Sequence, residues 1–229
     1  MANIDLNILS LHRQAGQNQS RLPGLHIAEA PRGASRSRRS DRLILLLSFN
    51  IPAFSDERQA ELLARLEELY YEKAGSTTMA MRALIEDLNS LILNLNLKYA
   101  GSRPQVTGTF AVLVLRGELL FVAQNGPGHL FALLPGKVDY LHDEKLTNRG
   151  LGLNRTPSIY YAQLTVSPED KLLFSVDLPE GWDEDTFRTA YTQPLEKAYL
   201  RFMEDAGDDL KGVLVDLTPG TGHLTLLSP

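Results

Sequence analysis

The chain of 229 residues contains no cysteine and no long hydrophobic run. Without cysteine it can form no disulfide, thiolate nucleophile, Cys-ligated zinc site or iron–sulfur cluster. Its apolar runs, such as Leu43–Leu47, have the length of a strand, whereas a membrane-spanning helix needs about 18 or more apolar residues. Any catalysis must therefore use oxygen or nitrogen groups, and we expect no membrane crossing.

The first 25 residues lack the basic, apolar and small-residue segments of a secretory signal, so we expect a cytoplasmic protein. A hydrophobic fraction of 43% and a charged fraction of 22% are typical of a globular domain. The length fits a single domain, and we expect the whole chain to form one.

Positive charge is scarce except in one segment. Residues 1–42 carry seven Arg and three acidic residues, a formal charge of +4, whereas the remainder of the chain has a formal charge of −9. The basic residues concentrate around Arg36, Arg38 and Arg39, which form either a flexible arm or an anion clamp for a phosphorylated partner. The segment holds no aromatic residue and the rest of the chain is acidic, which argues against nucleic acid.

Hydrophobic periodicity predicts the order of the elements. A buried strand over Leu43–Phe49 precedes two amphipathic helices, which begin near Ser55 and Thr77. Antiparallel hairpins then follow, with a helical segment before the last one. The hairpins are expected over 107–124, 130–141, 159–175 and 210–227, and the helical segment over 183–205. Separate runs of helices and strands favour an α+β class with largely antiparallel sheets.

No catalytic motif stands out. The five histidines lack the spacing of a helical zinc site, and the chain has neither a phosphate-binding loop nor a Gly-x-Ser-x-Gly elbow. Asp177 after a strand and Asp208–Asp209 before the last hairpin are candidate ligands for Mg²⁺ or Mn²⁺. The alternative for each is an ordinary turn or capping residue.

Several segments, taken in order, resemble the PPM family, the PP2C-type metal-dependent serine/threonine phosphatases, in its bacterial form. The segment Gly108–Val114 with the hairpin that follows is similar to the family's Gly-Ser/Thr-Thr-Ala strand and Val-Gly-Asp-Ser-Arg strand. Ser167–Leu178 resembles the turn and strand that end in Ser-Asp-Gly-Leu, and Asp208–Leu217 resembles the closing Asp-Asn strand. The resemblance implies a PP2C-like antiparallel β-sandwich of two sheets flanked by helices, in α-β-β-α layers. It implies a PP2C-like domain over 40–229, after a basic segment, 1–39, that is poorly structured or carries strands.

The family's metal ligands are largely missing. Its Asp-Gly-x-Gly-Gly strand end falls on Leu47–Ala53, which has no carboxylate and no glycine, so that Phe49, Asn50 and Phe54 mark a degenerate cleft. The metal-binding Asp of Ser-Asp-Gly-Leu falls on Val176, with Asp177 one residue later. Two divalent ions with so few carboxylates would keep much of their charge uncompensated.

The resemblance and these departures together predict a catalytically inactive pseudophosphatase without a cofactor, which binds another protein, a phosphorylated one in the sharper version. A first alternative is a divergent active phosphatase that binds Mg²⁺ or Mn²⁺ through Asp177, Asp208 and Asp209. A second is a structural assembly module. On these grounds we lean against an enzyme.

Overall fold

The computed structural model describes residues 3–147 and 149–228, and the chain divides into two compact units. The central unit comprises Pro23–Pro127 and Asp143–Leu164. The terminal unit comprises Met1–Leu22, Gly128–His142 and Thr165–Pro229. The division therefore interleaves segments that are distant in sequence, and each unit is described by itself.

The central unit contains a sheet with the strand order β3-β4-β5-β6-β9. The strands are β3 (Leu25–Glu29), β4 (Asp41–Phe49), β5 (Gly108–Arg116), β6 (Leu119–Asn125) and β9 (Tyr160–Thr165). Every residue of β4 and β5 is buried except Arg42, Phe49 and Arg116, which are half-buried. This burial explains why the two strands appear in the sequence as continuous apolar runs. A four-residue helix, α3 (Glu144–Thr147), lies in the long connection that leads to β9.

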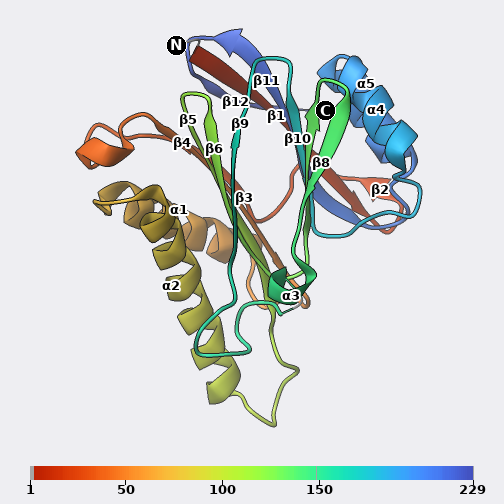
Figure 1. Ribbon diagram of the computed structural model, residues 1–229. Helices are drawn as coiled ribbons and strands as arrows, with labels where there is room; N and C mark the ends of the chain where they lie inside the picture. The colour runs from red at the N-terminus through yellow and green to blue at the C-terminus, as the bar shows by residue number, and fades with distance from the viewer. Residues whose placement is uncertain (1–2, 148, 229) are drawn as a thin grey trace. The chain divides into compact units, whose positions relative to one another are not determined.

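Two long helices, α1 (Asp56–Glu72) and α2 (Thr77–Lys98), cover one face of this sheet (Figure 1). Each begins at a serine whose hydroxyl accepts a backbone N–H: Ser55 from Arg58, and Ser76 from Met79. The apolar stripes of both helices share a core with β4 and β5; among the buried members are Leu43, Leu45, Leu66, Tyr70, Leu84, Ile85, Leu88, Phe110 and Val112. The helices and strands expected around residues 43–125 are confirmed here.

The terminal unit contains a second sheet with the order β12-β1-β11-β10-β7-β8, and a short β2 that also pairs with β1. The strands are β1 (Asn3–Gln14), β2 (Gln17–Asn18), β7 (His129–Leu134), β8 (Lys137–Leu141), β10 (Lys171–Ser175), β11 (Leu210–Gly220) and β12 (Leu224–Leu227). All recorded pairings are antiparallel except that of β12 with β1. The sheet is therefore largely antiparallel, as the sequence indicated.

Helices α4 (Glu184–Thr192) and α5 (Leu195–Glu204) belong to the terminal unit, and Pro194 stands at the start of α5. The single tryptophan, Trp182, packs edge-on against Phe202 at 5.0 Å between ring centroids. Its indole nitrogen donates to the Phe202 carbonyl, and Phe187 joins the same apolar cluster. The tryptophan is therefore a built-in reporter of this unit's core.

Two of the expected hairpins, those over 159–175 and 210–227, are wrong. β9 and β10 belong to different sheets, and β11 does not pair with β12. In the last case β1 lies between them, and the turn is held by Asp5, whose Oδ1 accepts the N–H groups of Thr221, Gly222 and His223. The two confirmed hairpins, β5–β6 and β7–β8, also belong to different sheets.

The first 39 residues contain β1, β2, β3 and a 3₁₀ turn, η1 (Arg36–Arg38). No helix among residues 3–147 and 149–228 is long and apolar enough to cross a membrane.

Candidate functional site

The end of β4 is where the sequence places the missing metal ligands, and apolar side chains occupy it. Phe49, Ile51 and Ala53 are partly buried and pack against the core of the central unit. The ring of Phe54 lies 5.1 Å from that of Phe49. Aromatic and aliphatic groups offer no lone pair to a hard cation, so this strand end is closed by packing.

Asn50 directly follows β4, and both halves of its side-chain amide are bonded to backbone. Its Oδ1 accepts the N–H of Thr107 at 2.8 Å, and its Nδ2 donates to the carbonyl of Gln105 at 3.2 Å. The backbone N–H of Asn50 also donates to the Thr107 carbonyl. Asn50 therefore fastens the segment before β5 to the end of β4.

The connection between β8 and β9 is long, and its second half is tied to the rest of the central unit. Leu151 is fully buried and exchanges two backbone hydrogen bonds with Gly108. The buried amide of Asn89 accepts the N–H of Gly152 and donates to the carbonyls of Asn154 and Arg155. Gly152 has φ +87°, and a Cβ there would lie 2.3 Å from Ile92, so only glycine fits.

Asn96 makes a second tie one heptad along α2. Its Nδ2 donates to the carbonyls of Val106 and Gly152, and its Oδ1 accepts the N–H of Val106. The roles of Asn89 and Asn96 were missed from the sequence. The available signal was their spacing of seven residues, which puts both amides on the face that also carries the apolar stripe.

Arg38, one of the three candidate anion ligands, is fully buried in the central unit. Its guanidinium donates to the carbonyls of Gly75 and Ser76, lies 3.7 Å from the Asp41 carboxylate, and is 5.1 Å from the centroid of the Tyr70 ring. Burial, with the Tyr70 hydrogen bond to Asp41 as the second cause, raises the pKa of Tyr70. Arg38 thus joins the basic segment to the connection between α1 and α2.

Arg36 and Arg39 differ from Arg38 because both are exposed. Within the described part of the chain, neither forms an ion pair. Arg116 fixes the same segment by donating to the Ser37 carbonyl and to both carboxylate oxygens of Asp41. The two free guanidinium groups are therefore presented by a fixed turn.

In the terminal unit, Val176 and Asp177 follow β10. The N–H of Val176 donates to the Lys211 carbonyl, and Ser175 donates its hydroxyl to the Asp177 carbonyl. Val176 is half-buried, whereas the Asp177 carboxylate is exposed.

Asp208 and Asp209, just before β11, hold the turn after β1. Asp209 accepts the N–H of Ala15 through Oδ1 at 3.0 Å, and the Asp208 carbonyl accepts the N–H of Gly16. Both carboxylates are exposed. The capping alternative raised from the sequence is what the structure shows for Asp209.

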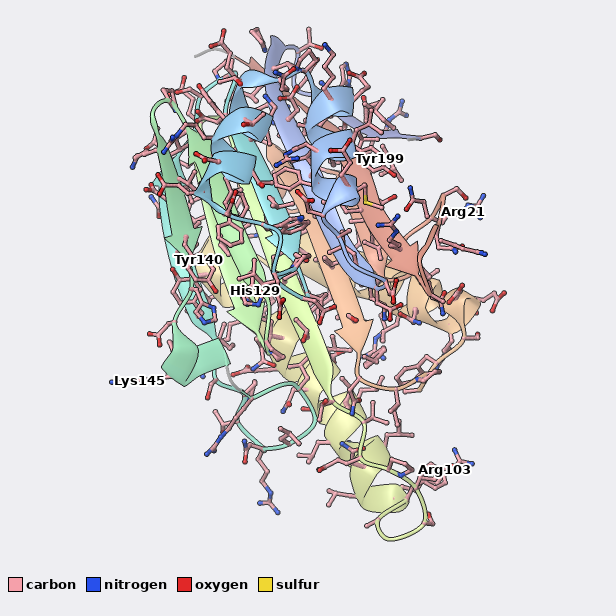
Figure 2. All side chains as sticks on the ribbon, turned by 90° about the vertical axis from the view of Figure 1, so that its right-hand side faces the viewer. Arg21, Arg103, His129, Tyr140, Lys145 and Tyr199 are labelled. Atoms are coloured by element: carbon pink, nitrogen blue, oxygen red, sulfur yellow. The ribbon has the colours of Figure 1, made fainter. Side chains whose placement is uncertain are left out.

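Two histidines, which sequence spacing did not connect, meet near Asp177 in the terminal unit. His129 forms a 2.7 Å hydrogen bond with the hydroxyl of Tyr140; both residues are labelled in Figure 2. The ring of His142 stacks on both rings. Burial, and after it the neighbouring His142, lowers the pKa of His129. The arrangement is an aromatic stack and contains no activated nucleophile.

The donor set does not fit a pair of divalent cations. Among residues 3–147 and 149–228, no three His, Asp or Glu side chains lie close enough together to hold a metal ion. Asn50 Oδ1 and Asp209 Oδ1 each accept a backbone N–H, and the side chains of Phe49 and Val176 carry no oxygen. The side chains of Phe49 and Val176 therefore offer no ligand to a hard cation.

Three solved structures represent what the chain is similar to. The serine/threonine phosphatase of S. agalactiae matches with a TM-score of 0.68 at 14% identity, over 94% of this chain and 100% of that one. The catalytic domain of PstP in complex with 2 manganese ions matches with 0.66 at 13% identity and the same coverage. PppA, a key regulatory component of T6SS in Pseudomonas aeruginosa, matches with 0.67 at 15% identity, again over 94% and 100%.

The chain has the PP2C-like fold. The resemblance found in the sequence is thereby confirmed for the fold, over nearly the whole chain. No protein-family profile and no curated protein sequence matches it. At identities of 13–15% the likeness establishes the fold, and the function has to be argued from the residues of this PP2C-like chain.

Proposed function

We propose that the chain is a catalytically inactive PP2C-like module, a pseudophosphatase, that needs no metal and acts by binding another protein. The strand end after β4 carries this proposal: Phe49 and Ile51 pack into the core, and the Asn50 amide is bonded to backbone through both its oxygen and its nitrogen. A hard divalent cation needs several oxygen ligands, and water activation for phosphoryl hydrolysis depends on it.

The partner surface we propose is the turn that carries Arg36 and Arg39. Guanidinium groups match the geometry of phosphate and carboxylate oxygens, and a fixed turn reduces the conformational entropy lost on binding. Because Arg38 is buried, it supports this surface from below and does not contact the partner. We infer that the partner presents a phosphorylated segment there.

The first experiment is calorimetric titration of the full chain with MnCl₂ and MgCl₂, run beside an assay of para-nitrophenyl phosphate hydrolysis. We expect no saturable binding up to millimolar metal, and the same background hydrolysis for the unchanged protein and for Asp209→Ala. Two ions bound per chain, with hydrolysis lost in Asp177→Ala or Asp209→Ala, would establish a divergent metal-dependent phosphatase.

The second experiment measures binding of a degenerate phosphoserine peptide pool and of its unphosphorylated counterpart by fluorescence anisotropy. We expect the phosphorylated pool to bind more tightly, and the preference to disappear in Arg36→Gln/Arg39→Gln. The matched control is Arg58→Gln/Arg188→Gln, which removes two exposed guanidinium groups elsewhere. Equal binding of both pools by all three proteins would favour an assembly module that does not recognise phosphate.

A further inference from the structure

A cavity of about 490 Å³ opens in the central unit beside the C-terminal end of α2. Its walls come from the residues after β4, from the end of α2 with the loop that follows, and from the tied connection near Gly152. Aliphatic side chains line it, among them Ile51, Ala53, Leu93, Leu97, Val106 and Leu153. The volume lies within the range of roughly 300–1,000 Å³ that is usual for small-molecule sites.

Side-chain amides hold the walls of this cavity in place. Asn96 ties the end of α2 to Val106 and Gly152, and Asn50 ties the residues after β4 to Gln105 and Thr107. All of these bonds lie within the central unit. A cavity whose three walls are already bonded together requires little ordering when a ligand enters.

One cationic side chain lines the cavity. The Arg103 guanidinium lies 4.7 Å from the centroid of the Tyr99 ring, and the Lys98 ammonium lies 5.3 Å from the same centroid. Figure 2 shows Arg103 on the loop beyond the end of α2. Across the described ranges, Arg103 forms no ion pair, so the ring orients a cation whose charge is not neutralised by a carboxylate.

The three stretches that build the cavity contain no acidic residue, although the chain has a formal net charge of −5. No Asp or Glu occurs in residues 42–55, 88–117 or 145–168. These same stretches carry Lys98, Arg103, Arg149 and Arg155. The cavity therefore combines aliphatic walls with a local excess of positive charge, which complements a ligand with an apolar body and an anionic group.

We propose that this cavity binds a small amphiphilic anion, with its apolar body against the aliphatic walls and its anionic group on Arg103. The site is distinct from the turn at Arg36 and Arg39 and goes beyond the proposed function. It stands on this cavity alone, so it holds whether or not the chain binds a phosphorylated partner.

The test is calorimetric titration of the full chain with three ligands that share one alkyl chain: decanoate, decyl phosphate and decanol. We expect saturable binding of one molecule per chain, with at least one anion bound more tightly than decanol. The better of the two anions identifies the head group. Arg103→Gln should weaken anion binding by about 10-fold and leave decanol unchanged, because only the anion makes a charge-assisted hydrogen bond.

Filling the cavity provides the second variant. Ala53→Phe should abolish binding of all three ligands, whereas Ala60→Phe, on the exposed side of α1, should not. Arg58→Gln is the matched control for charge. No saturable binding of either anion, equal affinity for decanol and the anions, or equal losses in the control variants would overturn the proposal. Arg103 is exposed, so its variant decides the question even if Ala53→Phe does not fold.

Discussion

The two units use polar side chains in different ways. In the central unit, Arg38, Asp41 and Asn89 are buried, and they join long connections to helices and strands. In the terminal unit, Asp5 in β1 and Asp209 before β11 are more accessible, and their carboxylates accept backbone N–H groups of turns. A buried polar group that loses its partner costs more free energy than an exposed one.

The same comparison explains how the chain departs from a metal-binding PP2C-like protein. In the central unit, Phe49 packs against the core and the Asn50 amide is bonded to backbone. In the terminal unit, Asp177, Asp208 and Asp209 are exposed, and Asp209 accepts one backbone N–H through Oδ1. The proposal that the chain binds no metal therefore rests on the central unit more than on the terminal one.

The largest effect is expected from Arg38→Met. It removes a buried guanidinium and its bonds to Gly75 and Ser76, so the free energy of unfolding should fall by about 3 kcal/mol. Arg39→Met, at the exposed neighbouring position, should change it by less than about 0.5 kcal/mol. Urea unfolding followed by circular dichroism measures both. Similar small losses in the two variants would mean that the basic segment is not anchored by Arg38.

A smaller and more local effect is expected from Asn89→Ala. Its amide makes three bonds to the connection near Gly152, so the variant should lose about 2 kcal/mol and release that segment. Hydrogen exchange of residues 149–157 should accelerate while that of β4 is unchanged. Asn94→Ala, at an exposed position on the same helix, is the control and should leave exchange as it is. Unchanged hydrogen exchange of residues 149–157 in Asn89→Ala would contradict the role of the Asn89 amide in holding this segment.

The sharpest direct comparison is Asn50→Ala against Asp209→Ala. Each removes a near-surface side chain bonded to backbone N–H, so each should cost about 1 kcal/mol or less. We expect neither to alter Mn²⁺ titration. A loss of unfolding free energy several times larger in Asp209→Ala than in Asn50→Ala would contradict the view that accessible turn contacts in the terminal unit contribute little to stability.

The smallest effects are pH-dependent and lie within the terminal unit. The N–H of His223, with those of Gly222 and Thr221, lowers the pKa of Asp5, so its stabilisation is complete at neutral pH and lost as pH falls below about 4. Burial raises the pKa of Asp170, so the folded state loses stability relative to the unfolded state as the pH rises and this carboxyl group ionises.

Urea unfolding from pH 3 to pH 7, followed by Trp182 fluorescence, separates these two carboxyl groups. The loss of unfolding free energy in Asp5→Asn, relative to the unchanged protein, should shrink as pH falls. The unfolding free energy of Asp170→Asn should rise relative to that of the unchanged protein as pH rises. Parallel trends in the two variants would show that the environments of the two groups are alike.

Much of the fold follows from the sequence, because periodicity records which residues are buried. The apolar run of β4, the serine cap of α1, and the hairpins β5–β6 and β7–β8 all have local signals, whereas the cap of α2 is Ser76 and not the expected Thr77. The pairing of strands that are distant in sequence has no local signal. The chain passes from one sheet to the other between β6 and β7 and again between β9 and β10. A short connection has the same sequence pattern whether it joins strands of one sheet or of two.

The candidate site divides in the same way. The loss of metal ligands at Phe49, Asn50 and Val176 was inferred from the motifs that resemble the family, and it stays a prediction. The burial of Arg38 could not, because a lone arginine in a polar segment is indistinguishable from its exposed neighbours until α1 and α2 pack around it. The role of Asp209 likewise depends on Ala15, 194 residues away in sequence.

The position of β1 between β11 and β12 has a consequence for biosynthesis. β11 and β12, which lie on either side of this strand, are synthesised long after it, so β1 must wait for both before these pairings can form. Residues 23–127, by contrast, supply four of the five strands and both long helices of the central unit in one continuous stretch. Contacts of such unequal sequence separation imply that the central unit folds during translation and the terminal sheet closes after it.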